Sequence, residues 1–574
     1  MSLDERHEPS FAELFTPKLV TVLREGYGFS EFRKDAVAGL TVAIVALPLS
    51  LAIAIACGLS PDRGLYTAII GGFIISAFGG SRFQIGGPAG AFIVLIATVI
   101  EKHGYDGLVL ATLMAGAIML AVGFFRLGTY IKYIPFPVTV GFTTGIAVII
   151  FASQIKELMG LAIVKEPAAL IPKLEAIRAA LPTWKPVTVA LSAFAVGTIL
   201  LLRKYKPHWP GFLIAVVAAT LLAAGLSLDV ATVGSRFGAV PSGLPAPALP
   251  AFSLAKMRAV LPDALAIALL GAIESLLSAV VADGMSGRRH RSNCELVAQG
   301  GANILSVIFG GMPATGTIAR TATNVRSGAH GPVSGMLHAV YLLAFMLVAA
   351  PLASYIPLAA LGAVLAVVSW NMAEKEEFAA LLKASKGDAL VLLATFLITI
   401  FEDLTLGIGV GVTLGAFLFL HRMAEAVEIE GGGAMASRDQ ADTRGAARTP
   451  YIAGGTEAQD VVVYRISGAF FFGATASVIA TLDRMGQLPR AFVFDFSGVP
   501  MVDVTAAKGI EGFHRKLHRH GTVLYIAGAR PHVRATLLKA GVRPPDVVFT
   551  PSVADAEAQA RPAPGQTGPA IAET

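Results

Sequence analysis

Long runs without a charged side chain recur along the first 424 or so residues of this chain. Each run is about long enough to cross a hydrocarbon core of roughly 30 Å as a helix. Buried helices of soluble proteins rarely stay free of charge for this length, and rarely do so this many times. The pattern therefore predicts a polytopic α-helical membrane protein. The clearest runs are Ala36–Pro61, Gly64–Ser81, Phe83–Ile100, Gly107–Phe125, Tyr133–Ile155 and Gly211–Leu228.

Composition supports the same class. The 574 residues are 55% hydrophobic and only 15% charged, whereas about 25% of a soluble chain is charged. The basic residues stand in small clusters without interleaved aromatic residues, so no nucleic-acid partner is expected. Cys57 and Cys294 lie in or beside apolar segments, and we expect neither a disulfide nor a metal site, and no cofactor. The polar N-terminus does not read as a cleaved signal peptide.

The basic clusters also predict an orientation, because Lys and Arg collect in cytoplasmic loops. With a cytoplasmic N-terminus, clusters around Arg126, Arg203, Arg289 and Lys383 fall on the inner side, and the acidic pair Glu402-Asp403 falls outside. Residues 156–185 disagree, since this external stretch holds five Lys or Arg, partly offset by three Glu. Hydropathy alone gives about 12 or 13 spans, with ambiguity at 87–90 and 320–330.

The two halves of the membrane region resemble each other. Phe78-Gly79-Gly80 has a counterpart in Phe309-Gly310-Gly311, and two further matches, Gly58 with Gly284 and Tyr133 with Tyr355, follow at similar offsets. If each half has seven spans, an odd number, the second half enters the membrane inverted, as in many secondary transporters.

The two ambiguous stretches occupy equivalent places in this repeat. Both are interrupted by small residues or Pro, and we expect short broken helices that meet near the membrane midplane, lining a cavity. Two helix N-termini directed at one point would favour an anion, because free N–H groups and the helix dipole both attract negative charge.

Three ionisable residues lie in otherwise apolar or small-residue stretches. Glu274 stands in an apolar helix and is interpreted as a coupling site for a proton or cation, or else as the structural partner of an Arg. Arg320 follows the start of the second broken helix and would add positive potential there, or neutralise Glu274; the two roles are compatible. His338 is expected to be a satisfied packing residue rather than a proton relay.

After Arg422 the composition changes to that of a linker followed by a small α/β domain. Strands are predicted at 461–472, 491–496, 522–527 and 546–550, and helices at 475–485, 505–520, 531–540 and 553–560. Asp495 and Asp503 are interpreted as turn and helix-capping residues. The chain shows no phosphate loop or catalytic constellation, so we do not expect an enzyme.

The residues also carry a family pattern. Gly271-Ala272-Ile273-Glu274-Ser275-Leu276-Leu277-Ser278, Asp283-Gly284-Met285, Gly300-Gly301-Ala302-Asn303 and Pro313-Ala314-Thr315 with Arg320-Thr321 resemble the sulfate permease (SulP) family, the bacterial relatives of the SLC26 anion transporters. Asp495-Phe496-Ser497-Gly498-Val499 with Asp503 resembles a STAS domain. A weaker resemblance is to the bacterial C4-dicarboxylate branch.

The resemblance implies 14 transmembrane helices in two inverted seven-span repeats with broken third and tenth helices, a core and a gate that move like an elevator, homodimers, and an inner-membrane location with both termini cytoplasmic. It also implies a site between the third and tenth helices. The positions carried over are Gly87, Pro88, Ala89 and Gly90 in the third helix, Thr317, Ile318, Ala319, Arg320 and Thr321 in the tenth, Ser50 and Ile53 in the first, and Glu274 and Ser278 as the coupling pair in the eighth.

Two positions depart from the family pattern. Leu49 follows Pro48 where many eukaryotic relatives carry Gln, which leaves Ser50 and the apolar Ile53 as the first-span contribution. Glu274 stands where sodium-coupled bicarbonate carriers have Asp, which favours proton coupling.

The resulting expectation is a proton-coupled carrier of sulfate, bicarbonate or C4-dicarboxylate. A sodium-coupled carrier or exchanger, an anion channel, and a membrane sensor signalling through the STAS domain are the alternatives, and the STAS domain is a possible docking site for a cytoplasmic protein. The expected organisation is a cytoplasmic segment 1–34, a transport domain 35–424 with repeats at about 35–228 and 260–422, a linker 425–456, a STAS domain 457–560 and a disordered tail 561–574.

Overall fold

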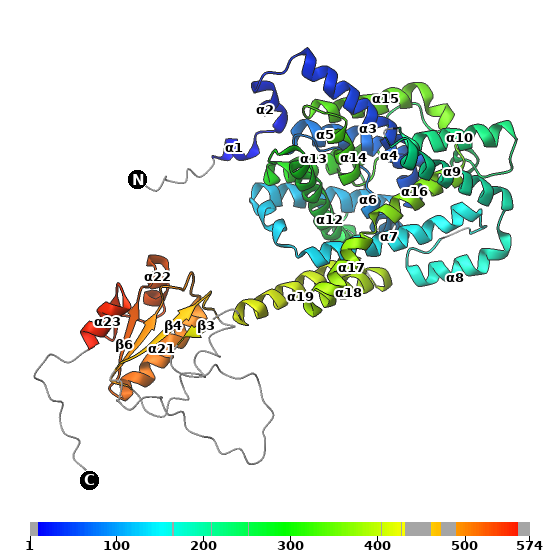
Figure 1. Ribbon diagram of the computed structural model, residues 1–574. Coiled ribbons are helices and arrows are strands. Elements are labelled where there is room, and N and C mark those ends of the chain that lie inside the picture. Colours follow the sequence, from blue (N-terminus) through cyan, green and yellow to red (C-terminus); the bar gives the residue numbers. More distant parts are fainter. Residues whose placement is uncertain are drawn as a thin grey trace, which may run out of the picture. The chain divides into compact units, whose positions relative to one another are not determined.

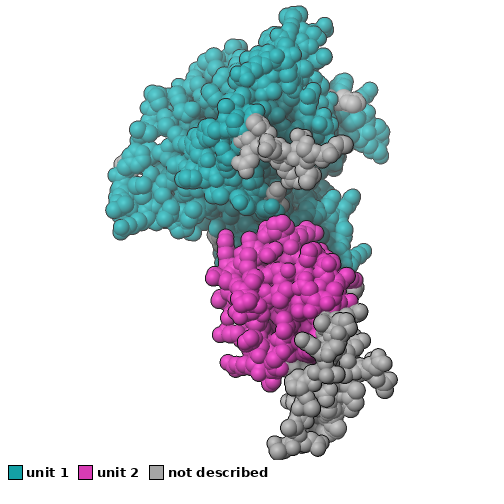
Figure 2. Space-filling view, turned by 90° about the vertical axis from the view of Figure 1, so that its left-hand side faces the viewer, with its two compact units in different colours: residues 1–413 teal, residues 414–574 magenta. Residues whose placement is uncertain are grey.

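In the computed structural model the described residues are 10–163, 166–207, 209–250, 252–402, 404–425, 428–430, 461–471 and 489–560. The chain divides into two compact units, Met1–Thr413 and Leu414–Thr574 (Figure 2). The predicted helix at 475–485, most of the linker and the tail 561–574 lie outside the described residues.

The first half of unit 1 is helical apart from one short strand (Figure 1). Long apolar sequences form its membrane-length helices, and Gly104, with φ 68°, interrupts the longest of them, α6, between the two predicted spans 83–100 and 107–125. The elements are α1 (Phe11–Phe15), α2 (Lys18–Arg24), α3 (Phe29–Ala56), α4 (Pro61–Tyr66), η1 (Thr67–Gly71), α5 (Gly72–Phe78), β1 (Gly86–Gly87), η2 (Gly90–Phe92), α6 (Ile93–Phe124), η3 (Leu127–Tyr133), α7 (Phe136–Met159), α8 (Leu170–Ala180), η4 (Leu181–Thr183), α9 (Pro186–Tyr205), α10 (Gly211–Gly225) and α11 (Val233–Phe237).

The second half follows a similar order, with a two-residue strand before a short helix. Its elements are α12 (Leu254–Ser286), α13 (Ser292–Ile308), β2 (Thr315–Gly316), α14 (Ile318–Arg326), α15 (Val333–Ala353), α16 (Leu358–Met372), α17 (Lys375–Ala384), α18 (Lys386–Phe401) and α19 (Leu404–Glu425), which runs past the boundary between the units.

Helices of the two halves pack against each other. α3 packs on α15, α6 on α12 and α13, and α7 on α16 and α18. Small residues allow these backbones to approach closely, as is usual between membrane helices. A Cβ on Gly39 would lie 2.4 Å from Ser334 O, and one on Gly141 would lie 2.6 Å from Leu392 O. The contacts of α3 and α15, and of α7 and α18, therefore depend on glycine.

By length and composition, eight helical segments among the described residues are long and apolar enough to cross a membrane, and α10 is a shorter apolar helix. α4, η1 and α5 follow one another without a gap from Pro61 to Phe78, and α14 is a short helix that follows β2. Together with the family shown below, this architecture makes the chain a multi-pass membrane protein.

Within unit 2, the described strands form a sheet in the order β3-β4-β5-β6-β7, with β3 antiparallel and the rest parallel. Side chains of α21 and α22 pack on one face of this sheet and α23 packs on the other. The elements are β3 (Glu428–Glu430), β4 (Val461–Ser467), β5 (Ala491–Asp495), α21 (Val504–Arg519), β6 (Val523–Ala527), α22 (Pro531–Lys539), β7 (Val547–Thr550) and α23 (Val553–Ala560).

One predicted boundary in this unit is wrong. The strand expected to run to residue 472 ends at Ser467, because Gly468 takes φ 102° and the chain turns. The capping role of Asp503 is confirmed, since its Oδ1 accepts a hydrogen bond of 2.7 Å from Ala506 N at the start of α21. Asp495 Oδ1 likewise accepts from Ser497 N at 2.9 Å and holds the turn after β5.

Candidate anion site

The two interrupted stretches of unit 1 meet each other. β1 and β2 pair antiparallel, with Gly86 opposite Gly316 and Gly87 opposite Thr315. Thr317 N extends the pairing with a hydrogen bond of 3.0 Å to Ile85 O. Helical structure begins at Gly90 on one chain segment and at Ile318 on the other. Two helix starts, each with free N–H groups, thus lie beside one small sheet.

A buried side chain of α13 holds the approach to β2 in place. Asn303, only 1% exposed, accepts a hydrogen bond from Ala314 N at 3.0 Å and donates to Ala314 O at 2.8 Å. Thr315 Oγ1 then donates to Gly271 O of α12 at 3.0 Å. These bonds fix the backbone just before α14. The predicted site did not include Asn303 or Thr315, although both stand within the family motifs.

Arg320 is the buried cation of this region, with 1% of its surface exposed. Its Nη2 donates to Pro88 O at 3.2 Å and to Ser50 Oγ at 3.3 Å. Its Nε and Nη1 have no hydrogen-bond partner in the described part of the chain. A Cβ on Gly87 would lie 2.4 Å from Nη1. The guanidinium therefore joins α3, the β1 segment and α14, and keeps two donor atoms free.

Hydroxyl groups link the same elements to α12. Thr321 Oγ1 accepts from Ile85 N at 3.1 Å and from Ser278 Oγ at 3.0 Å. Ser50 Oγ donates to Ala46 O at 2.7 Å while it accepts from Arg320. All three hydroxyl side chains are buried. The structure therefore forms two hydrogen-bonded pairs, Arg320 with Ser50 and Thr321 with Ser278, on consecutive residues of α14, and these four side chains are called the cluster below.

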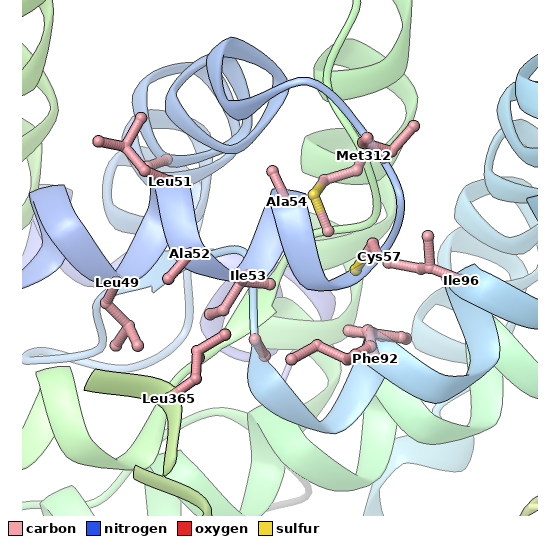
Figure 3. Packing of buried hydrophobic residues seen from close by; sticks show 14 of the residues in the cluster. Leu49, Leu51, Ala52, Ile53, Ala54, Cys57, Phe92, Ile96, Met312 and Leu365 are labelled. Carbon is pink, nitrogen blue, oxygen red and sulfur yellow. The ribbon is translucent and has the colours of Figure 1, made fainter. Parts of the chain in front are cut away.

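The first-span residues next to Ser50 are apolar. Figure 3 shows Ile53 directed toward Leu365 of α16 and Phe92 at the end of η2, with Leu49 one turn away on the same side of α3. Ile53 is 1% exposed. Its side chain belongs to the same apolar core as Phe92 and Leu365.

The remaining predicted positions border this cluster. Pro88 supplies its carbonyl to Arg320, and Ala89 is buried next to it. Gly90 and Thr317 are half-buried, whereas Ile318 and Ala319 are exposed. The exposed pair shows that one side of the α14 start is open.

Glu274 is not part of the hydrogen-bonded cluster. It is 9% exposed on α12, one turn before Ser278. Within the described residues it has no hydrogen bond or ion pair, so the suggested ion pair with Arg320 is absent. The charge that acts on it is the like charge of Glu374, which precedes α17. A carboxyl group in this setting favours its neutral form.

A separate cavity of about 650 Å³ lies where α3 ends, and its walls also come from α6, α7, α8 and α11. None of the predicted site residues lines it. It contains the ion pairs Arg236–Glu157 at 2.5 Å and Lys173–Glu166 at 3.0 Å. Of the five basic residues in 156–185, Lys173 is paired with Glu166 in this cavity, and Lys185 is paired with Asp229 elsewhere.

Comparison with known proteins identifies the family. A model of the sulfate permease family matches residues 32–395, and a STAS domain model matches residues 456–556. The chain belongs to the sulfate permease family. The family is one of anion transporters, and the resemblance carried by the Glu274 and Arg320 motifs is thereby confirmed.

Curated relatives of this sulfate permease family member cover nearly its whole length. It is 39% identical to the putative sulfate transporter YvdB of Bacillus subtilis over 90% of the chain and 95% of the relative. It is 32% identical to the bicarbonate transporter BicA of Synechocystis sp. over 89% of the chain and 91% of the relative.

Solved structures show the same fold. The transmembrane domain of a cyanobacterial bicarbonate transporter BicA matches with a TM-score of 0.60 and 33% identity, covering 66% of this chain and 97% of that one. Murine Slc26a9, an anion transporter in the inward-facing state, matches with a TM-score of 0.82 at 19% identity, covering 97% and 96%. The second match extends the shared fold to the membrane unit and the STAS domain together.

Proposed function

We propose that this chain is a secondary active transporter of a small oxyanion, which binds between the starts of α6 and α14. The observation that carries the proposal is the free donor capacity of Arg320. Its Nε and Nη1 are buried without a partner among the described residues, beside two helix starts. A buried guanidinium with unmade hydrogen bonds is costly, and an anion supplies the missing acceptors.

The substrate class follows from the chemistry of the site and from the relatives. Arg, backbone N–H groups and hydroxyl groups suit an oxygen-rich anion, and the named relatives are a putative sulfate transporter and a bicarbonate transporter. Sulfate, bicarbonate and C4-dicarboxylates all present such oxygens. Arg320 and two helix starts do not discriminate among these three anions. Competition by each unlabelled anion against uptake of a labelled one would identify the substrate.

Glu274 is proposed as the proton-coupling group. A carboxylate without a partner in an apolar helix is expensive to move through a membrane, and protonation removes that cost. Its proximity to Ser278 connects it to the Arg320 cluster through Thr321. A proton on Glu274 would thus accompany the anion, whereas sodium coupling or exchange would leave uptake independent of a proton gradient.

We further propose 14 spans in two inverted seven-span repeats. Cross-contacts support it, because α3 with α15 is matched by α12 with α6, and α7 with α18 by α16 with α9. Under this arrangement α3–α6 and α12–α15 form a core that moves as an elevator against a gate of α7, α9, α10, α16, α18 and α19. The transport domain would span 35–424, the linker 425–456 and the STAS domain 457–560, in a homodimer of the inner membrane with both termini cytoplasmic.

The test is uptake of radiolabelled sulfate, bicarbonate and succinate into proteoliposomes containing the full chain. Arg320→Gln should abolish saturable uptake of whichever anion the wild type carries. Arg326→Gln, on the exposed end of the same helix, is the matched control and should retain it. Saturable uptake by Arg320→Gln at the wild-type KM would refute the assigned site.

Coupling is tested with the same vesicles. An inward proton gradient should drive accumulation by the wild type, and Glu274→Gln should remove this drive while the anion still exchanges. Replacing sodium with choline should have no effect. Flux without accumulation under any gradient would point to a channel, and accumulation that follows sodium would overturn proton coupling.

A further inference from the structure

Buried polar atoms without partners gather around the β1–β2 pair. In the described part of the chain, 13 buried side-chain nitrogen and oxygen atoms have no hydrogen-bond partner, and eight of them belong to five residues. Native proteins satisfy the large majority of buried polar atoms, so such a concentration calls for an explanation. The five residues are Ser81, Gln84, Arg320, Asn324 and His338.

His338 is the titratable member of this set that the proposed transport mechanism does not use. It lies on α15 and is 0% exposed. Neither ring nitrogen makes a hydrogen bond of full geometry, although the backbone of Gly335, three residues earlier, interacts with the ring. The structure confirms that the ring is buried, but it gives the ring only a weak contact with the Gly335 backbone. The sequence showed only an apolar neighbourhood, and whether a buried ring finds a partner depends on the helices that surround it.

Glycines bring neighbouring backbones close to this ring. A Cβ on Gly72 would lie 3.7 Å from His338 Cε1 and 3.0 Å from Gly86 O, and a Cβ on Gly39 would lie 3.2 Å from His338 N. The imidazole thus stands beside α5, next to β1 at Gly86. Gly87, the following residue, approaches Arg320 Nη1. His338 and Arg320 thus lie near consecutive residues of β1.

The charges around His338 come mainly from one residue. Arg320 on α14 acts electrostatically on the ring. Neither α5 nor η1, which pack against α15, carries an ionisable side chain, and α15 itself contributes only Tyr341.

Two further elements, α3 and α4, pack against α15 and carry acidic side chains. On α3, Asp35 stands one turn before Gly39 and accepts hydrogen bonds from Tyr27 Oη, His330 N and Gly331 N. On α4, Arg63 donates to Gly310 O, and Asp62 stands beside it in the sequence. Burial is the larger influence on the His338 ring, and Arg320 is the charged side chain that acts on it.

We propose that His338 is a second proton-binding site, whose occupancy is linked to anion binding at Arg320. This inference rests on the proposed anion site. When no anion is bound to Arg320, its positive charge disfavours protonation of the His338 imidazole. An anion on Arg320 cancels that field, and the free ring nitrogen then accepts a proton without any other bond being broken. By linkage, a proton on His338 strengthens anion binding by the same factor.

The experiment measures how anion affinity depends on pH. Radiolabelled sulfate is the probe, because its charge stays constant between about pH 5.5 and 8, where an imidazole titrates. Equilibrium binding to the full-length protein in detergent is compared for the wild type, Glu274→Gln, His338→Gln and the double variant. His520→Gln, which removes an exposed histidine of unit 2, is the matched control.

The linkage predicts that affinity rises as pH falls, by about fivefold to 150-fold across the titration. Glu274→Gln should keep part of this rise and His338→Gln should keep part of it, while the double variant should be flat. His520→Gln should match the wild type. If Glu274→Gln alone is flat, or if His338→Gln changes nothing, the proposal is overturned.

His338→Leu guards against simple misfolding. Removing an unpartnered buried imidazole in favour of an apolar side chain of similar size should hold or raise the thermal midpoint, yet the variant should lose the same share of pH dependence as His338→Gln. A lowered midpoint with unchanged pH dependence would assign His338 a packing role.

A second experiment does not require sulfate to be the substrate. It distinguishes failure of the His338 proposal from failure of the proposed anion site. The His338 resonance, assigned by its loss in the His338→Gln spectrum of histidine-labelled protein, should titrate at higher pH in Arg320→Gln than in the wild type. An unmoved resonance would overturn the coupling between the two residues. Loss of binding in Arg320→Gln at every pH would bear only on the anion site.

Discussion

Gly87→Ala is the substitution whose outcome the structure specifies most narrowly. Gly87 has φ 151°, a backbone conformation that side chains disfavour, and its new Cβ would lie 2.4 Å from Arg320 Nη1. Ordinary contacts of this kind begin at about 3.4 Å. The guanidinium must therefore move by about 1 Å, or the β1 backbone must move away from it.

A displacement of about 1 Å is enough to break the two hydrogen bonds that Arg320 Nη2 donates. The Nη2 bonds to Pro88 O and Ser50 Oγ are already 3.2 Å and 3.3 Å long, so they would exceed hydrogen-bond length. Hydrogen bonds from a charged group are each worth about 1.5–3 kcal/mol, and the strained backbone adds about 1–3 kcal/mol. Misplacing a binding group by this amount typically lowers activity by about 100-fold.

The assay is the KM and maximal rate of anion uptake in proteoliposomes, with the thermal midpoint of the purified protein as the folding check. Gly87→Ala should raise KM by tenfold or more. A tenfold rise corresponds to a loss of about 1.4 kcal/mol of binding free energy. Gly197→Ala on α9 is the control, since a Cβ there meets nothing within 4 Å. Wild-type KM and midpoint in Gly87→Ala would refute the placement of Arg320 against β1.

Two further predictions concern the support of the site and the second unit. Asn303→Ala leaves Ala314 N and O without their partners, each costing about 1–3 kcal/mol; it should lower the thermal midpoint and weaken anion binding. Asn303→Gln, which keeps an amide that can both accept from Ala314 N and donate to Ala314 O, should lose less. Equal loss in both variants would contradict the two-bond account.

In the STAS domain, burial acts to raise the pKa of Asp495, but hydrogen bonds from Arg465 and Ser497 outweigh it and lower the pKa. A lowered pKa stabilises the folded form above the unfolded pKa of about 3.9, and this gain is lost as pH falls through the folded value. Asp495→Asn should therefore reduce hydrogen-exchange protection of β5 in the full chain at neutral pH and converge with the wild type in acid. Asp546→Asn, at an exposed acid, is the control; a β5 effect that persists unchanged in acid would refute the charge argument.

The sequence determined the class and the family. Charge-free runs set the membrane helices, since unpaired charge is expelled from hydrocarbon. The sequence left ambiguous stretches at 87–90 and 320–330, whereas the structure has the strand β2 at Thr315–Gly316 and a helix from Ile318 to Arg326. Asp503 preceding an amphipathic helix was enough to predict its cap, because a cap is local.

Only the tertiary structure decided which groups have partners. Arg320 and Glu274 are both conspicuous in the sequence, yet Arg320 bonds Pro88 and Ser50 while Glu274 has no hydrogen-bond or ion-pair partner among the described residues. Asn303 lies in a recognisable motif, but its two hydrogen bonds to Ala314 form only because the chain reverses direction between α13 and β2. The sequence suggests a packing role for His338, and the structure shows that its ring is buried and that neither ring nitrogen makes a hydrogen bond of full geometry. Hydrogen bonds and burial are set by neighbours distant in sequence, so hydropathy and local motifs cannot supply them.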